Sequence, residues 1–229
     1  MAQLTFRRNI TRSLVDFHVR KAIEDRSIRG LILNIGAGDQ TYAAEIRGAG
    51  DRMIAADWPS SPTVNPVGVY CDAHDLPFRT GAFESVLCTE VLEHLADPRR
   101  ALLEIHRVLK GGGTALLTAP FQYQAHQRPH DFFRFTYDCL ELLAAEAGFE
   151  DARIYRRGES LAVALNSFKV FTRRIGSSVL LRLVGLAEKS YVRWYAARSL
   201  RIPLAHDAMA LGYTVIATKR EDRPPEPTH

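Results

Sequence analysis

The chain has few cysteines and no long apolar run. These absences limit the classes of protein to which it can belong. Its 229 residues include only three cysteines, which lie far apart and form no disulfide or metal-binding spacing: Cys71, Cys88 and Cys139. The eight histidines include no H-E-x-x-H or related pattern, so the sequence predicts no metal site. The N-terminal stretch lacks the apolar core and the small-residue cleavage site of a secretory signal. We therefore expect a cytoplasmic protein.

Strong charge is also lacking. The formal net charge of +4 hints at an anionic partner without naming one. No run interleaves basic and aromatic residues, and no recognised DNA or RNA module is present, so we expect no nucleic-acid partner. The hydrophobic content of 46% is ample for the core of one large domain.

Apolar runs and helical patterns alternate along the chain. The expected strands are 31–35, 52–57, 67–73, 83–90, 114–120, 151–159 and 211–219, and the expected helices include 10–28, 41–49, 97–110 and 140–148. Continuous apolar strands alternating with helices are typical of a parallel sheet that is covered on both faces. The sequence therefore predicts an α/β fold in which ligands bind beyond the carboxyl ends of the strands.

The stretch "LILNIGAGDQT" bends at a Gly-x-Gly turn directly after the first strand. Gly36 and Gly38 allow a tight turn and a close approach of a ligand. The dinucleotide pattern G-x-G-x-x-G needs a third glycine, but Thr41 stands there. Asp57 follows Gly36 by 21 residues and ends the second strand, where a carboxylate can accept both ribose hydroxyls of an adenosine. The placement of the turn and the acid on successive strands predicts a ligand that contains adenosine.

The glycine turn and the strand-end acid belong to a series of six segments along the chain: "LNIGAGD", "AAD", "CDAHDLPF", "VLCTEVLEHL", "RVLKGGG" and "ALLTAPF". Together they resemble the class I S-adenosylmethionine-dependent methyltransferases of the methyltransferase domain 11 type, over about residues 30–150. The resemblance implies a Rossmann-like, mostly parallel seven-stranded sheet with helices on both faces and an antiparallel last strand. It also implies S-adenosylmethionine as the cofactor. We expect an N-terminal helical segment (1–29), a methyltransferase domain (30–220) with a helical insertion before the last strand (160–210), and a disordered tail (221–229).

The strand ends supply the expected cofactor contacts. These are Asn34, Gly36, Ala37, Gly38, Asp57, Trp58, Asp72, Ala73, Thr89 and Glu90. Asn34 stands where the family usually has an acid, and its side-chain oxygen could hold backbone amides of the turn. Gln40 stands where the family often has a third glycine.

The loop after the fifth strand, "PFQYQAHQRPHDFFRFT", resembles a subgroup found with bacterial glycan biosynthesis genes, with the pattern H-x-x-P-x-D-[FY]-x-R-[FY]-T. His126 or His130 could take a proton from an acceptor hydroxyl. Tyr123, Asp131 and Arg134 are candidate acceptor contacts. The structural interpretation, which we favour for the last two, is an Asp131–Arg134 ion pair, with a helix cap formed by the threonine that ends the pattern.

Residues 160–210 are helical by pattern and markedly basic. Their cations are Lys169, Arg173, Arg174, Arg182, Lys189, Arg193, Arg198 and Arg201. The segment "SSVLLRLVGLA" (177–187) is shorter than the roughly 20 residues that cross a bilayer, and its apolar residues could gather on one helical face. Three interpretations stay open: an acceptor-side cap, a homodimer interface, and peripheral contact with the inner face of a membrane.

The leading functional hypothesis is methyl transfer to a hydroxyl or amine of a small-molecule acceptor that is glycan-like or a natural product. A nicotinamide-dependent oxidoreductase is one alternative, and the missing glycine at position 41 speaks against it. A non-catalytic module that binds the cofactor or a partner is the other, and only the departures at Asn34 and in the glycine set support it.

Overall fold

The computed structural model of the chain describes residues 9–59, 68–198 and 209–221. Its centre is one seven-stranded sheet in the order β3-β2-β1-β4-β5-β7-β6. The strands are β1 (Leu31–Ile35), β2 (Arg52–Asp57), β3 (Val69–Tyr70), β4 (Phe83–Thr89), β5 (Leu109–Pro120), β6 (Phe149–Arg157) and β7 (Gly212–Lys219). Strand β7 runs antiparallel to both of its neighbours, and every other pairing is parallel. The predicted fold class is therefore confirmed.

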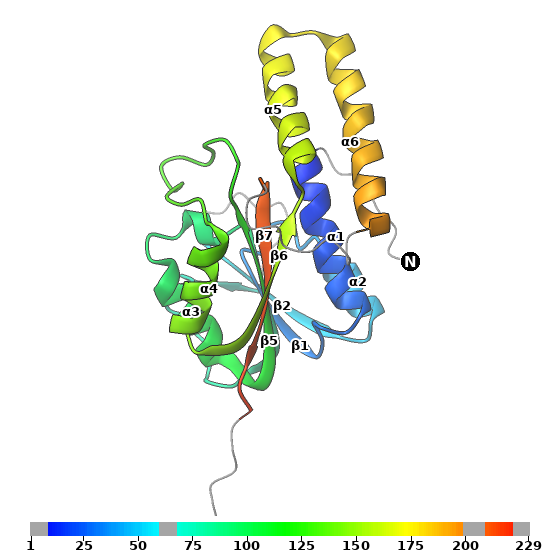
Figure 1. Cartoon of the computed structure of the whole chain (residues 1–229). Helices are drawn as coiled ribbons and strands as arrows, with labels where there is room; N and C mark the ends of the chain where they lie inside the picture. The colour runs from blue at the N-terminus through cyan, green and yellow to red at the C-terminus, as the bar shows by residue number, and fades with distance from the viewer. Residues whose placement is uncertain (1–8, 60–67, 199–208, 222–229) are drawn as a thin grey trace, which may run out of the picture.

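Helices cover both faces of the sheet (Figure 1). α1 (Ile10–Glu24) and α2 (Ala43–Gly48) lie on one face, and α3 (Pro98–Val108) and α4 (Tyr137–Glu146) lie on the other. Adjacent residues of β5 serve the two layers: Leu116 packs toward α1 and α2, whereas Leu117 packs toward α3 and α4. This alternation is the two-residue period of a strand, and burying a leucine in this way contributes about 1.5–3 kcal/mol.

The predicted insertion is a helical hairpin. α5 (Ser160–Ile175) and α6 (Ser178–Arg198) stand side by side beyond the carboxyl ends of the parallel strands (Figure 1). Gly176 links them in a left-handed conformation with φ of +74°. The base of the hairpin packs on α1 through a separate apolar cluster that includes Leu14, Val163 and Tyr195. The hairpin therefore stands at the edge where the sequence places the ligand.

Several predicted boundaries are wrong, among them the end of the first helix, which is Glu24, and the start of the fifth strand, which is Leu109. The third strand covers two residues and not 67–73, and the helix expected over 97–110 ends at Val108. The glycines at 111–113 lie inside β5, where the register against β4 slips between Phe83 and Ser85. A Cβ on Gly113 would lie 2.8 Å from the carbonyl oxygen of Lys110. The glycines thus permit a bulged, crowded strand, and they do not terminate the helix.

The last predicted segments fall partly outside the described part of the chain. Residues 222–229 of the expected tail and Arg201 of the basic segment lie outside it. Within the ranges that the structure describes, no helix combines the length and the apolar character needed to cross a membrane.

Candidate functional site

The glycine turn after β1 is held by the acid that ends β2. Gly38 N–H donates to Asp57 Oδ2 at 2.8 Å, and Trp58 N–H donates to Asp57 Oδ1 at 2.8 Å. Gly36 has φ of +66°, and a Cβ there would lie 2.3 Å from Val91 Cγ2. Asp57 is 8% exposed. Because a carboxylate has about four acceptor positions, Asp57 can hold the turn and still accept ribose hydroxyls.

Asn34 does not hold the turn as expected. Its side chain is buried, and its Oδ1 has no hydrogen-bond partner among the residues that the structure describes. The Ala37 amide donates instead to the Ala56 carbonyl of the neighbouring strand at 3.1 Å. Gln40, where a glycine is common in the family, has φ of +53°. This left-handed backbone accounts for the family's preference, because a residue with a Cβ is strained there.

The remaining predicted cofactor residues follow along the same edge. The Trp58 side chain is exposed, and Ala73 is buried. Asp72 Oδ1 accepts from the backbone amide of His74 at 2.9 Å and lies 2.6 Å from its Nδ1. The Cys71 amide donates to the Asp57 carbonyl, which ties this segment to the end of β2.

At the end of β4, Thr89 is buried and Glu90 adopts φ of +54°. Glu90 Oε1 accepts from Thr118 Oγ1 at 2.9 Å and from Arg157 Nη2 at 2.7 Å. Arg157 is fully buried at the end of β6 and also donates to the Ala119 carbonyl. The sequence did not single out Arg157 as a site residue. Its charge near the end of a predicted strand could have indicated such a role.

The loop after β5 is braced by its own ion pair. Arg134 donates two hydrogen bonds to Asp131, at 2.7 and 2.9 Å, and three more to backbone carbonyls. These bonds use all five donors of a guanidinium, and Thr136 Oγ1 accepts from the Cys139 amide as the N-cap of α4. The structural interpretation of this motif is confirmed. A contact of Asp131 or Arg134 with an acceptor stays a prediction.

The two candidate bases differ in their surroundings. The His130 ring is exposed, and its backbone carbonyl accepts from His94 Nδ1 at 2.5 Å. The His126 ring is half-buried, with the Tyr123 ring 5.1 Å away edge-on. Burial lowers the pKa of His126, and the neighbouring His94 lowers it further, which favours the neutral imidazole. His126 therefore has the environment of a tuned histidine.

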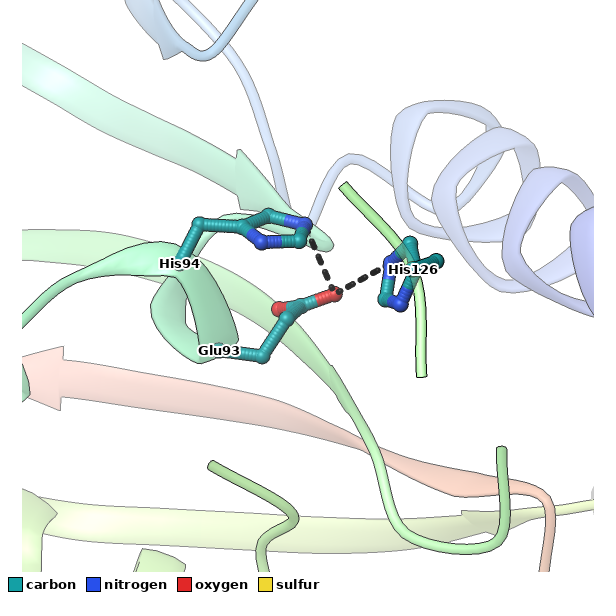
Figure 2. A group of neighbouring side chains, drawn as sticks. All are labelled: Glu93, His94 and His126. Atoms are coloured by element: carbon teal, nitrogen blue, oxygen red, sulfur yellow. Dashed lines mark ion pairs between the residues drawn. The ribbon is translucent and has the colours of Figure 1, made fainter. Parts of the chain in front are cut away.

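Glu93, His94 and His126 form a cluster that the sequence did not predict (Figure 2). Glu93 and His94 belong to the 3-10 turn η1 (Leu92–His94) after β4, and His126 comes from the loop after β5. Glu93 Oε1 lies 3.7 Å from His94 Nε2 and 4.0 Å from His126 Nε2. Burial raises the pKa of Glu93 well above its ordinary value, and the nearby Glu90 adds to that rise. No spacing rule signals this group, because the fold brings together two distant segments.

Part of the chain is similar in sequence to known methyltransferases. Residues 33–117 match the family model described as a methyltransferase domain. Demethylmenaquinone methyltransferase of Clavibacter sepedonicus is 34% identical over 98 residues, which are 38% of this chain and 39% of that protein. The chloroplastic 2-methyl-6-phytyl-1,4-hydroquinone methyltransferase 1 of Oryza sativa subsp. japonica is 35% identical over 99 residues, which are 38% of this chain and 28% of that protein. The chain thus aligns with only about a third of the length of these relatives.

Solved structures extend the likeness to almost the whole chain. An S-adenosylmethionine-dependent methyltransferase from Archaeoglobus fulgidus matches with a TM-score of 0.59 and 17% identity, over 91% of this chain and 94% of that one. Phosphoethanolamine N-methyltransferase 2 of Haemonchus contortus, in complex with S-adenosylmethionine, matches with a TM-score of 0.55 and 17% identity, over 89% of this chain and 53% of that one. The [4+2]-cyclase SpnF matches with a TM-score of 0.55 and 21% identity, over 90% of this chain and 82% of that one. At such identities the likeness shows a shared fold.

Sheet order, glycine turn and strand-end acid define the class I methyltransferase fold. Residues 33–117 match a methyltransferase domain, and the fold of the chain is shared with S-adenosylmethionine-dependent methyltransferases, as its motifs predicted.

Proposed function

We propose that the chain transfers the methyl group of S-adenosylmethionine to a hydroxyl or amine of a small-molecule acceptor. One observation carries the proposal: the glycine turn held by Asp57 and the histidine-bearing loop after β5 both lie beyond the carboxyl ends of the strands. The glycine turn can hold the adenosine, and the loop after β5 can contact the acceptor. Fold alone does not decide the reaction, since a [4+2]-cyclase shares it.

In the proposed step, a lone pair of the acceptor oxygen or nitrogen attacks the sulfonium methyl group in line with the departing sulfur. The carbon–sulfur bond breaks, its electron pair stays on sulfur, and S-adenosylhomocysteine leaves. The acceptor proton passes to a base, for which His126 is better placed than the exposed His130. Because the positive charge on sulfur disappears in this step, rate enhancement rests mainly on positioning.

Calorimetric titration with S-adenosylmethionine and then with NAD separates the three functional classes. The proposal expects binding of S-adenosylmethionine and none of NAD. NAD binding alone would support an oxidoreductase. Binding of S-adenosylmethionine without turnover on a panel of hydroxyl and amine acceptors, including sugars and quinols, would favour a non-catalytic module.

A glycan-like or natural-product acceptor, reached in the cytoplasm at the inner face of a membrane, is the finer proposal. The loop pattern after β5 supports the glycan, and the curated relatives are named for a demethylmenaquinone and a phytyl hydroquinone. Exposed apolar side chains on the α5–α6 hairpin support the membrane contact: Phe168, Phe171, Ile175, Val179, Leu183 and Leu186. Co-sedimentation with anionic vesicles at low salt tests that contact. Without binding, the hairpin would be a pocket wall or a homodimer interface.

A further inference from the structure

The cluster of Glu93, His94 and His126 contains several buried polar atoms without partners. Within the described part of the chain, both carboxylate oxygens of Glu93, the Nε2 of His94 and the Nδ1 of His126 have no hydrogen-bond partner. The Glu93 side chain is 0% exposed. Buried polar groups are nearly always hydrogen-bonded, and a buried carboxylate that accepts no hydrogen bond is costly. So many unpartnered atoms in one place indicate that the site is built to hold something.

The nearest cations do not satisfy Glu93. Arg157 directs its Nη2 to Glu90 and to the Ala119 carbonyl, and its Nη1 has no hydrogen-bond partner. Arg134 spends every donor inside its own loop. Among the described residues, the Glu93 carboxylate therefore has only the two imidazoles as ion-pair partners and accepts no hydrogen bond.

The three candidate ligand atoms all lie within 4.8 Å of one another. Ligands about 2.1 Å from a tetrahedral metal lie roughly 3.4 Å apart, so small side-chain rotations would close the present spacing. His126 and His94 are 24% and 15% exposed at their side chains, which leaves the imidazole side open to solvent. A bound cation would thus keep an open coordination position.

A hydrogen bond orients the His94 imidazole, whereas the His126 imidazole has an ion-pair contact behind its ring. His94 Nδ1 lies 2.5 Å from the His130 carbonyl, which can only accept, so the proton sits on Nδ1 and the lone pair sits on Nε2. His126 Nδ1 lies 3.6 Å from Asp131 Oδ1, and Asp131 is held by Arg134. A hydrogen-bonded carbonyl, as at His94, is a usual outer partner of a metal-binding histidine. The Asp131 carboxylate lies beyond hydrogen-bond distance of His126 Nδ1.

We propose that Glu93, His94 and His126 bind one divalent transition-metal cation of the Zn²⁺ type through one carboxylate oxygen and two Nε2 atoms. Two imidazoles and one carboxylate favour such an ion over Mg²⁺ or Ca²⁺, which prefer oxygen ligands. The geometry of these three residues supports metal binding independently of the proposed function. Its role, which rests on the proposed function, is to coordinate the acceptor hydroxyl and lower the pKa of that hydroxyl. His126 Nε2 would then be a ligand and not the base, and the proton of the coordinated hydroxyl would pass to water on the solvent-exposed side of the imidazoles.

Metal titration of the full-length protein tests the site without any acceptor. Protein stripped with a chelator is titrated with Zn²⁺ by calorimetry and with Co²⁺ by visible absorption. We expect one equivalent to bind, and His94→Ala, His126→Ala and Glu93→Gln each to weaken binding at least tenfold. The matched control is His130→Ala, because only the backbone carbonyl of His130 serves the site; its affinity should stay within about twofold of the parent.

Absence of binding at millimolar metal would overturn the proposal, as would binding that all three variants leave unchanged. If Glu93→Gln does not fold, His126→Ala carries the test, because this ring is partly exposed. Each sample is also titrated with S-adenosylmethionine. Metal binding without cofactor binding would contradict the proposed methyl transfer and leave the metal site standing, and the reverse result would contradict the metal site alone.

Discussion

At the residue scale, the Asp57 carboxylate has a structural role and an expected binding role. Its carboxylate accepts the Gly38 and Trp58 amides, and it lies where the ribose of the cofactor is expected. The glycine turn and the ribose contact are therefore coupled through one side chain. A substitution at this position should act on cofactor affinity both directly and through the shape of the turn.

We expect Asp57→Ala to weaken S-adenosylmethionine binding by roughly ten- to a hundredfold, because a charge-assisted hydrogen bond contributes about 1.5–3 kcal/mol. Isothermal titration calorimetry measures the change. Asp72→Ala, whose carboxylate is more exposed, is the matched comparison and should have a smaller effect. Unchanged affinity in a folded Asp57→Ala protein would reject the ribose assignment.

Asp51 is a structural acid away from the site. It accepts from the Gly30 amide at 2.7 Å and from Arg26 Nη2 at 3.0 Å, and its side chain is 4% exposed. Burial alone would raise the pKa of Asp51, but the hydrogen bonds from Arg26 and Gly30 outweigh burial, so the pKa lies below its ordinary value. Asp51 therefore anchors the start of β1.

Asp51→Asn should lower the free energy of unfolding at pH 7 by about 1.5–3 kcal/mol. Because the folded-state pKa is depressed, the stabilisation is present above the unfolded-state pKa, about 3.9, and disappears as the pH falls through the folded-state value. Denaturant unfolding of both proteins at pH 7 and near pH 3 checks this. A difference in stability that stays constant over this range would contradict the assignment.

At the scale of the element, the α5–α6 hairpin divides its apolar residues between two faces. The sequence suggested one face for the residues of 177–187, but Val184 is buried while Val179, Leu183 and Leu186 are 64%, 56% and 61% exposed. Inside the hairpin, Lys169 pairs with Glu188, so Lys169 does not add to the basic surface. The exposed row is thus free to meet another apolar surface.

Replacing Val179, Leu183 and Leu186 together by serine should reduce binding to anionic vesicles on the order of tenfold or more. The stability of the protein should hardly change, because these side chains are exposed. Co-sedimentation across a salt series is the measurement, and parent binding should weaken as salt rises. Leu142→Ser, an exposed position on α4, is the control. Equal binding by the triple variant and the parent would exclude this face as the membrane contact.

At the scale of the whole molecule, the last strand joins the sheet. β7 pairs with β5 along Thr114–Pro120 and with β6 along Phe149–Arg157, so it lies inside the sheet although it comes last in the chain. Val215 and Ala217 belong to the main apolar core. Residues 33–117, which match the methyltransferase family, therefore cannot complete the sheet alone.

A chain that ends at residue 208 should lose cooperative unfolding and should aggregate. Its β5 and β6 would expose unpaired edges and part of the core. A chain that ends at residue 221 keeps β7 and should unfold like the full chain. Thermal unfolding by circular dichroism, with size-exclusion chromatography, compares the two; a soluble, cooperatively folded 1–208 chain would show that β7 is dispensable.

The sequence alone determined the features that depend on neighbours in the chain. Alternating apolar runs predict the sheet, Gly36 and Gly38 predict the turn, and Asp97 and Thr136 cap the helices that follow them. Each of these follows from backbone conformation or from hydrogen bonds within a few residues, which local sequence encodes. The motif order was enough to identify the domain and its cofactor.

Only the tertiary structure decided which distant side chains meet. Glu93 and His94 reach His126 because β4 and β5 are adjacent in the sheet, and Glu90 reaches Arg157 across β5 and β7. The exposed face of the hairpin likewise depends on where α5 and α1 pack on α6. Such contacts depend on strand order and helix packing, which no residue spacing specifies, and so both the candidate metal site and the hairpin surface came from the fold.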